Sequence, residues 1–176
     1  MSAGERPLTA GRVEFDVADP TGDDARSCLD AYLDELDGRF PDGFDPGRSI
    51  SVDADELTAP EGLLLLARLD GDPIGCGALK FHDDEPAEIK RMWVDPSARG
   101  LGLGRRLLEE LEERARERGV TRVRLETNGA LTEAIGLYRS AGYEEVDPFN
   151  DEPYAHHWFE KRLEAPPEAG SRPGAR

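Results

Sequence analysis

The sequence predicts an α/β protein in which helices pack on a mixed sheet. Two kinds of pattern lead to this fold class: short apolar or alternating segments typical of strands, and longer segments whose apolar residues recur at helical spacing. The two patterns are interleaved along the chain. Their order is strand, helix, long loop, three strands, helix, strand, helix and two strands, which predicts a sheet covered by helices.

Residues 12–17 alternate apolar and polar side chains, as a half-buried strand does. A helix is expected from Asp23 to Gly38, because apolar residues keep helical spacing until that glycine. The proline- and glycine-rich loop that follows carries Phe40 and Phe44. These rings either fold onto the core or line the mouth of a substrate site.

A hairpin and a further strand are expected at residues 63–69, 74–81 and 87–94. The clearest helix spans residues 101–118, because it combines an apolar stripe with Glu–Arg pairs four residues apart and a glycine stop. The remaining elements are a strand at 120–126, a helix at 130–140 and strands at 143–146 and 155–163.

A chain of 176 residues with 38% hydrophobic content is long enough for one hydrophobic core. We therefore expect a single domain over residues 12–164. Residues 1–11 are predicted to be a flexible lead, and residues 165–176 a disordered tail, because the tail has too little apolar surface to bury.

The net charge of −16 argues against a general nucleic-acid binder, because such a surface repels a polyanion. Residues 1–60 hold five arginines against fifteen carboxylates, so their charge is 5 − 15 = −10. Residues 88–106 reverse the balance, with five basic side chains against two acidic ones, or 5 − 2 = +3. A basic segment therefore lies within an acidic protein, whose acidity fits either a high-salt habitat or a coding bias.

Cys28 and Cys76 are the only cysteines, and the histidines are not clustered. This pattern predicts neither a disulfide framework nor a metal site, and it fits a reducing cytoplasm. Residues 1–11 lack the apolar core of a signal peptide, and the longest aliphatic run, 63–67, is too short for a membrane span. We expect a cytoplasmic protein without a membrane partner; the sequence is also compatible with a homodimer.

The most informative stretch is residues 99–106, Arg-Gly-Leu-Gly-Leu-Gly-Arg-Arg, which stands directly before the clearest helix. Glycines expose backbone N–H groups, and the start of a helix adds a partial positive charge, so the stretch predicts an anion site suited to a pyrophosphate. A dinucleotide fingerprint would need glycine at Leu107, and a Walker loop would need Gly-Lys-Ser/Thr. Neither is present.

Two segments together resemble the GNAT superfamily of N-acetyltransferases. Residues 87–108, Ala-Glu-Ile-Lys-Arg-Met-Trp-Val-Asp-Pro-Ser-Ala-Arg-Gly-Leu-Gly-Leu-Gly-Arg-Arg-Leu-Leu, resemble that family's central strand, acyl-CoA pyrophosphate loop and helix. Residues 136–143, Gly-Leu-Tyr-Arg-Ser-Ala-Gly-Tyr, resemble its tyrosine-bearing helix and Gly-aromatic turn. The resemblance covers residues 13–163 and implies a largely antiparallel sheet of six or seven strands with splayed central strands.

The resemblance implies an N-acetyltransferase that moves the acetyl group of acetyl-CoA directly to a primary amine of a small molecule or protein, without a metal. Two alternatives stay open on the sequence. One is a non-catalytic acyl-CoA-binding module, and the other is a transferase of a longer acyl group.

Two side chains match the catalytic positions of the family. Glu88 stands where relatives place the general base, and a half-buried carboxyl there would have a raised pKa; the alternative is a solvated glutamate at a strand edge. Tyr138 matches the tyrosine that protonates the departing thiolate, and its alternative role is a packed aromatic ring.

The family binds the oxyanion and the pantetheine arm through the main chain of its central strand, which here is Met92, Trp93 and Val94. The side chains of Met92 and Trp93 also suit an ordinary core. Many relatives carry Asn seven residues before the tyrosine, where this chain has Leu131, so Asn128 becomes the candidate for that cofactor contact. The pyrophosphate would contact Arg99, Gly100, Leu101, Gly102, Leu103, Gly104 and Arg105.

The acceptor site is not readable from the sequence, because residues 38–61 and 147–155 form loops without a pattern. The adjacent His156 and His157 point to opposite faces of a strand, which suits a core or substrate-pocket role better than a metal. Acidic residues near the two phenylalanines either form an acidic, aromatic mouth for a cationic amine or belong to the solvated surface. They are Asp34, Asp37 and Asp45.

Overall fold

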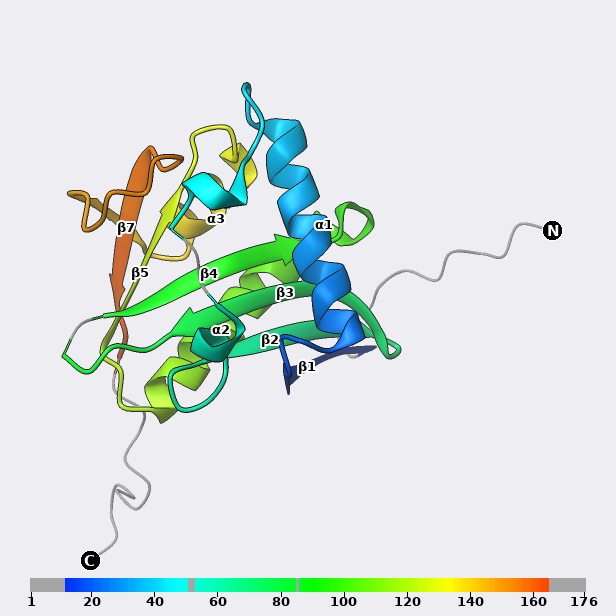
Figure 1. Cartoon of the computed structure of the whole chain (residues 1–176). Helices are drawn as coiled ribbons and strands as arrows, with labels where there is room; N and C mark the ends of the chain where they lie inside the picture. Colours follow the sequence, from blue (N-terminus) through cyan, green and yellow to red (C-terminus); the bar gives the residue numbers. More distant parts are fainter. Residues whose placement is uncertain (1–11, 51–52, 85, 165–176) are drawn as a thin grey trace, which may run out of the picture.

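The computed structural model describes residues 12–50, 53–84 and 86–164 (Figure 1). The predicted lead and tail lie outside these residues. The elements follow the predicted order, and every predicted boundary lies within two residues of the observed one. They are β1 (Val13–Ala18), α1 (Asp23–Arg39), β2 (Gly62–Leu69), β3 (Asp72–Lys80), β4 (Ala87–Val94), α2 (Leu103–Glu117), β5 (Arg122–Thr127), α3 (Thr132–Ser140), β6 (Glu144–Val146) and β7 (His157–Arg162).

The strands form one seven-stranded sheet in the order β1-β2-β3-β4-β5-β7-β6. Neighbouring strands are antiparallel except for β4 and β5, which are parallel. The last strand, β7, inserts between β5 and β6. The expected mixed, largely antiparallel sheet is therefore confirmed.

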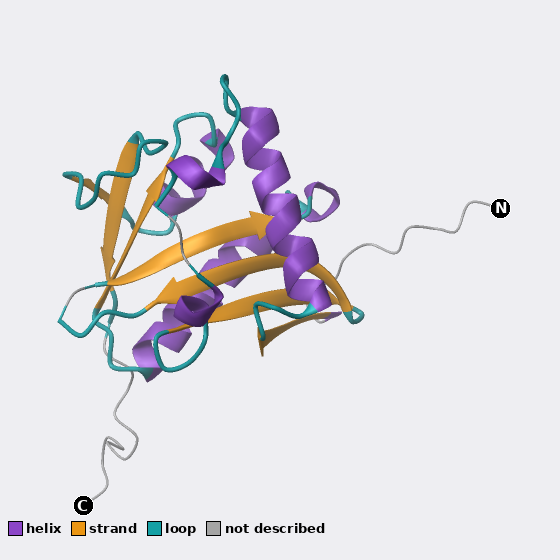
Figure 2. Ribbon diagram, viewed as in Figure 1, coloured by secondary structure: helices purple, strands orange, loops and turns teal. Residues whose placement is uncertain are grey.

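Helices cover both faces of the sheet: α1 crosses one face, and α2 and α3 pack on the other (Figures 1 and 2). The strand β2 explains this arrangement. Leu64 and Leu66 pack with Cys28 of α1, whereas Leu65 packs with Leu111 of α2. The uninterrupted apolar run of β2 is thus buried on both sides, as expected for a strand between two layers of helix. None of the helices in the described part of the chain combines the length and apolar character needed to cross a membrane.

The sheet opens in its middle. β4 and β5 pair only through Ala87 with Val123 and Glu88 with Arg124, and beyond these pairs the two strands diverge (Figure 1). The splayed central strands that the family resemblance implied are therefore present.

A bulge in β4 lies beside this opening. Arg91 and Met92 both lie opposite a single residue of β3, Gly77, and Arg91 has a left-handed φ of 57°. A Cβ at Gly77 would stand 2.7 Å from Cδ1 of Leu111 and 3.0 Å from the sulfur of Met92. Glycine at this position therefore allows α2 to pack closely behind the bulge.

A buried charged cluster joins α2 to the far half of the sheet. Glu112 is 3% exposed and accepts hydrogen bonds from the Tyr143 hydroxyl at 2.8 Å and from Lys161 Nζ at 2.9 Å. Burial and the Glu112 charge both raise the pKa of Tyr143, so the phenol remains a donor.

Replacing Tyr143 by Phe should lower the free energy of unfolding by about 1.5–3 kcal/mol, because the buried carboxylate loses a donor. Urea denaturation measures this change. In the control variant Tyr154→Phe, only an exposed N–H of Asp45 loses its acceptor, so stability should change by about 0.5 kcal/mol or less. Equal effects of the two substitutions would contradict a special role for the buried pair.

Candidate functional site

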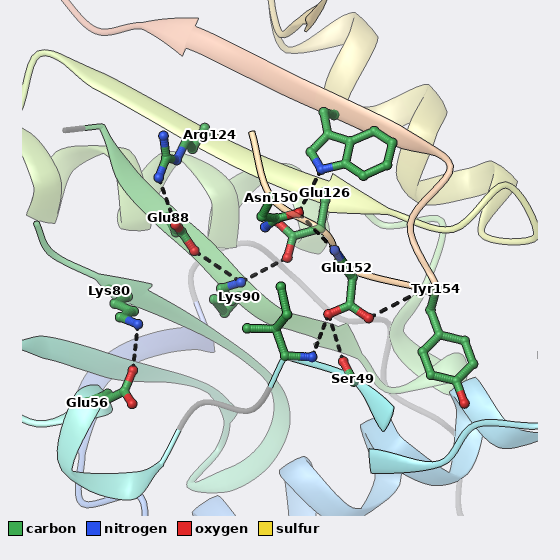
Figure 3. A network of polar contacts seen from close by, with 12 residues as sticks. Ser49, Glu56, Lys80, Glu88, Lys90, Arg124, Glu126, Asn150, Glu152 and Tyr154 are labelled. Atoms are coloured by element: carbon green, nitrogen blue, oxygen red, sulfur yellow. Dashed lines mark hydrogen bonds and ion pairs between the residues drawn. The ribbon is translucent and has the colours of Figure 1, made fainter. Parts of the chain in front are cut away.

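A cavity of about 160 Å³ opens where β4 and β5 diverge. Its walls come from α1 and the loop after it, from both diverging strands, from α3 and from the loop before β7. Figure 3 shows its polar side. The lining residues are Tyr32, Leu36, Phe40, Phe44, Pro46, Ser49, Ile50, Ile89, Lys90, Arg91, Met92, Leu125, Glu126, Thr127, Asn128, Leu131, Ala134, Tyr138, Glu152, Tyr154 and Ala155.

A row of charged side chains connects the two strands beside the cavity (Figure 3). Lys90 Nζ lies 2.9 Å from Glu126 Oε1 and 3.1 Å from Glu88 Oε2. Glu88 Oε1 in turn lies 3.0 Å from an Arg124 nitrogen and 3.2 Å from His82 Nε2. The carboxylates and Lys90 are only 10–11% exposed, so their mutual pairing offsets much of the cost of burying charge.

Glu88, the predicted base, faces this ion-pair row and does not line the cavity. Burial raises the pKa of its carboxyl, but the charges and hydrogen bonds of Lys90 and Arg124 together outweigh burial, so the pKa is lowered. The expectation of a raised pKa at Glu88 is therefore wrong. The adjacent cations favour the ionised form more strongly than burial disfavours it.

Glu126, which the sequence reasoning missed, does line the cavity. Its Oε1 is bound to Lys90, whereas its Oε2 is buried without a hydrogen-bond partner among the described residues. Strand alternation places Glu126 opposite the buried Val123 and Leu125, and this was the signal in the sequence. Glu126 lines a cavity because β4 and β5 diverge, and the sequence pattern alone does not predict this divergence.

Tyr138 is a packed aromatic ring that also lines the cavity, and its role as a general acid stays a prediction. Its ring is 6% exposed and packs against Tyr143 and Phe159, with ring centroids 5.8 and 6.1 Å away. It also lines the cavity, and its hydroxyl makes no hydrogen bond to the part of the chain that is described. Burial raises the pKa of Tyr138, so the phenol stays protonated at neutral pH.

The three residues of the predicted oxyanion segment follow the bulge of β4. Trp93 is buried in the core beneath α1, whereas Met92 and Val94 pack in the core beneath α2. Their side chains therefore pack in the core, and Met92 also lines the cavity. The bulge takes Met92 out of regular pairing with β3, whereas Trp93 and Val94 pair with Cys76 and Gly75; none of the three pairs with β5.

The predicted anion loop carries a row of free amide donors. None of the backbone N–H groups of residues 100–105 donates to a backbone acceptor in the described structure, and the first helical bond of α2 runs from Arg106 to Gly102. Gly100 and Gly102 have left-handed φ values of 84° and 75°, and a Cβ at either would point into open space. Such a turn before a helix is an anion-binding arrangement.

The basic side chains of this loop are held by neighbouring elements. Arg99 is paired with Glu35 of α1 and donates to the carbonyl of Val94 at 2.9 Å, and Arg105 donates to the Ser140 hydroxyl at the end of α3. Leu101 is exposed and Leu103 is buried.

Asn128 uses its whole amide group to shape the cavity wall. Its nitrogen donates to the Tyr154 carbonyl at 2.7 Å, and its oxygen accepts from the Ala130 N–H at 2.8 Å. Both polar atoms of the Asn128 amide are therefore engaged by neighbouring loops. A cofactor in the cavity would meet only the part of Asn128 that lines the cavity.

Glu152 fixes another wall of the cavity. It accepts hydrogen bonds from the Ser49 hydroxyl at 2.9 Å, the Ile50 N–H at 2.8 Å and the Tyr154 N–H at 3.3 Å (Figure 3). These bonds join the loop before β7 to the loop after α1. All three donors are neutral, so no cation among them compensates the Glu152 carboxylate.

Phe40 and Phe44 do line the cavity, and with Tyr154 they form an aromatic cluster with centroid distances of 4.8–5.8 Å. Asp37 and Asp45 are outside the lining and cap loop N–H groups. The aromatic part of the predicted mouth is thus present, and these two acids have local structural roles.

His157 is the first residue of β7 and His156 directly precedes it, and each contacts another group. His156 Nδ1 accepts from the Gly129 N–H at 3.0 Å, and His157 lies 3.2 Å from Glu145. Across the described residues, no three His, Cys, Asp or Glu side chains gather in a way that could hold a metal ion.

Comparison with known proteins identifies the class. The family description "Acetyltransferase (GNAT) family" matches residues 29–143. IAA acetyltransferase of Azospirillum brasilense is 37% identical over 66% of this chain and 77% of its own. N-alpha-acetyltransferase RimI of Mycobacterium tuberculosis is 32% identical over 83% and 84% of the two chains.

A solved GNAT family acetyltransferase from Elizabethkingia anophelis, with acetyl-CoA bound, shares the fold with a TM-score of 0.61 and 18% identity. The alignment covers 86% of this chain and 99% of that one. The split sheet and the loop of free amides are features of an acyl-transferring enzyme. The chain belongs to the acetyltransferase (GNAT) family, as its two sequence motifs predicted.

Replacing Gly102 by Ala should weaken the binding of CoA at least tenfold, because a Cβ disfavours the left-handed turn that aims the amides. Isothermal titration calorimetry measures this affinity. Gly71 provides a matched control, since its φ is 89° and a Cβ there also meets nothing within 4 Å, but it lies in the β2–β3 turn. Gly71→Ala should cost similar stability and leave CoA binding unchanged; equal loss of binding in both variants would contradict the assigned role.

Proposed function

We propose that the protein transfers the acetyl group of acetyl-CoA directly to a primary amine of a small molecule or protein. The observation that carries this proposal is the cavity, whose lining includes both Glu126, one oxygen of which has no hydrogen-bond partner among the described residues, and Tyr138, whose hydroxyl has none. A carboxylate and a phenol in one cavity are a base and an acid for a reaction that must both remove and supply a proton.

The donor site is proposed to begin at the loop of residues 99–105. Its free amides would hold the pyrophosphate, and the pantetheine arm would run along Met92, Trp93 and Val94 toward the cavity. Arg99 and Arg105 flank this path, although each is already bound to a protein partner. Asn128 is proposed to touch the arm only through its cavity-facing surface.

In the proposed reaction, Glu126 accepts a proton from the ammonium group of the acceptor. The freed amine attacks the thioester carbon, so that a C–N bond forms and the carbonyl oxygen becomes an oxyanion. A main-chain N–H of the Met92 segment stabilises this oxyanion. The C–S bond then breaks as the carbonyl re-forms, and Tyr138 supplies the proton that the departing thiolate takes up. The attacking nitrogen releases its second proton to solvent, and the Tyr138 phenolate regains a proton from solvent.

The base is proposed to be Glu126 rather than Glu88. Glu88 has all its described contacts with cations or His82 and lies outside the cavity, whereas Glu126 lines the cavity and has one oxygen without a hydrogen-bond partner among the described residues. Lys90 binds both carboxylates and thereby orients Glu126.

Glu126→Gln should lower kcat by a factor of about 10²–10⁴, because the amide cannot accept the proton. Glu88→Gln is the matched comparison, since it also removes one carboxylate from Lys90, and its rate should fall by about tenfold or less. Steady-state kinetics with a saturating donor measures both. A larger loss for Glu88→Gln than for Glu126→Gln would restore Glu88 as the base.

Tyr138→Phe should lower kcat by about tenfold to a hundredfold or more, because the thiolate loses its proton donor. The raised pKa of Tyr138 also fixes the sign of a pH effect: the phenol keeps its proton above its ordinary pKa of 10.0. The wild-type rate should therefore not decline between about pH 8 and 10 through loss of this proton. An unchanged rate for Tyr138→Phe across that range would remove Tyr138 from the role.

The proposed function itself is tested by release of the CoA thiol from acetyl-CoA across a panel of primary amines. Turnover that depends on an amine supports it. Binding of acetyl-CoA without turnover of any amine would favour the non-catalytic module. Faster turnover with propionyl- or succinyl-CoA would favour the transferase of a longer acyl group.

A further inference from the structure

Arg91 is a charged residue of the cavity that the proposed reaction does not use. It is the extra residue of the β4 bulge, and its left-handed φ of 57° sets it apart from the regular strand. It lines the cavity next to Lys90. A non-glycine residue at such a φ is uncommon and worth a functional explanation.

The positive charge of Arg91 lowers the pKa values of two groups on the face of the sheet that α1 covers. Burial raises the pKa of Tyr32 in α1 to about 12, and the Arg91 charge acts in the opposite direction on the same phenol. Arg91 acts likewise on the thiol of Cys76, whose pKa burial and Cys28 raise. Tyr32 also lines the cavity, so Arg91 and Tyr32 border the same space.

The guanidinium of Arg91 has no hydrogen-bond or ion-pair partner among the described residues. Its neighbour Lys90 contacts two carboxylates, and the nearby Arg99 and Arg124 are both paired. A guanidinium offers five donors in a planar fork that matches a carboxylate. Arg91 is therefore an unused binding group in a cavity where the other cation is neutralised.

The negative groups of the cavity do not serve as partners for Arg91. Glu126 is bound to Lys90 through one oxygen, and Glu152 accepts three hydrogen bonds from neutral donors. The cavity lining thus combines an unpaired cation, Arg91, with two carboxylates, of which Glu126 is paired with one cation and Glu152 with neutral donors only. A molecule that carries both charges would complement both.

We infer that the acceptor is an amine that also carries a carboxylate, such as a free amino acid, and that Arg91 binds its carboxylate in two parallel hydrogen bonds. The inference rests on the proposed acetyl transfer and names its substrate class. The amine of the acceptor then lies toward Glu126, while the carboxylate fixes its orientation at the bulge. Arg91 is in this sense a specificity-determining residue.

The test compares pairs of acceptors that differ only in this group: free amino acids and their carboxamides. With wild-type protein, kcat/KM for the free acids should exceed that for the carboxamides by about tenfold or more, since a bidentate charged hydrogen bond is lost in the amide. Arg91→Gln should abolish this preference by lowering only the value for the free acids. Arg91→Lys, which keeps a charge without the planar fork, should retain part of it.

Arg26 supplies a matched control, because it is an exposed arginine of α1 without a described ion pair and outside the cavity. Arg26→Gln should leave the preference unchanged. Thermal unfolding and CoA titration of Arg91→Gln should match the wild type, which shows that fold and donor binding are intact.

Three results overturn the inference. They are equal or faster turnover of carboxamides by the wild type, an unchanged preference in Arg91→Gln, and a weakened affinity of Arg91→Gln for CoA, which would assign Arg91 to the donor. A protein that acetylates no amine of either kind contradicts the proposed function instead, so the two failures are distinguishable.

Discussion

The separation of β4 from β5 is the constraint on which the rest of the site depends. Two residue pairs hold the strands together at one end, and beyond them the facing edges have no partner strand. Backbone groups of a strand edge need a hydrogen-bonding partner, so such an opening inside a sheet is stable only where a ligand, side chains or water can supply one. The cavity, the bulge and the anion loop all lie along this opening.

The opening also explains why so much charge is buried around it. Lys90 bridges a carboxylate on its own strand and one on β5, and Arg124 compensates the first from β5. Each ion would be costly alone, and the row is tolerated because every member contacts an opposite charge. The same row leaves one oxygen of Glu126, a residue of the cavity lining, without a hydrogen-bond partner among the described residues. Glu88 is thus paired with cations through both carboxylate oxygens, whereas Glu126 is paired through only one.

The order of elements and their boundaries were readable from the sequence, because apolar periodicity and glycine stops act locally. The glycine turn before α2 was readable for the same reason. The sequence could not show which of Glu88 and Glu126 lines the cavity. Both stand on strands with alternating apolar and polar side chains, and only the angle between the two strands decides which side chain borders a cavity. Asn128 shows a related limit: its hydrogen bonds depend on where the loop of Tyr154 returns, far along the chain. The place of Arg91 in the cavity lining was also not predictable, because Arg91 lies in a β-bulge. A bulge interrupts the regular alternation of side chains between the two faces of a strand, on which the sequence pattern relies.

The helix α1 is joined to both sides of the opening. Glu35 is paired with Arg99, which follows β4, and Arg39 bonds to the Ala130 carbonyl and to Glu133 at the start of α3, which follows β5. A helix bonded to both walls acts as a brace across them. Because folding itself fixes their spacing, substrates meet walls that are already ordered, and less conformational entropy is lost on binding than in a site that must first close. The first helix of the chain is therefore part of the geometry in which the donor and the acceptor meet.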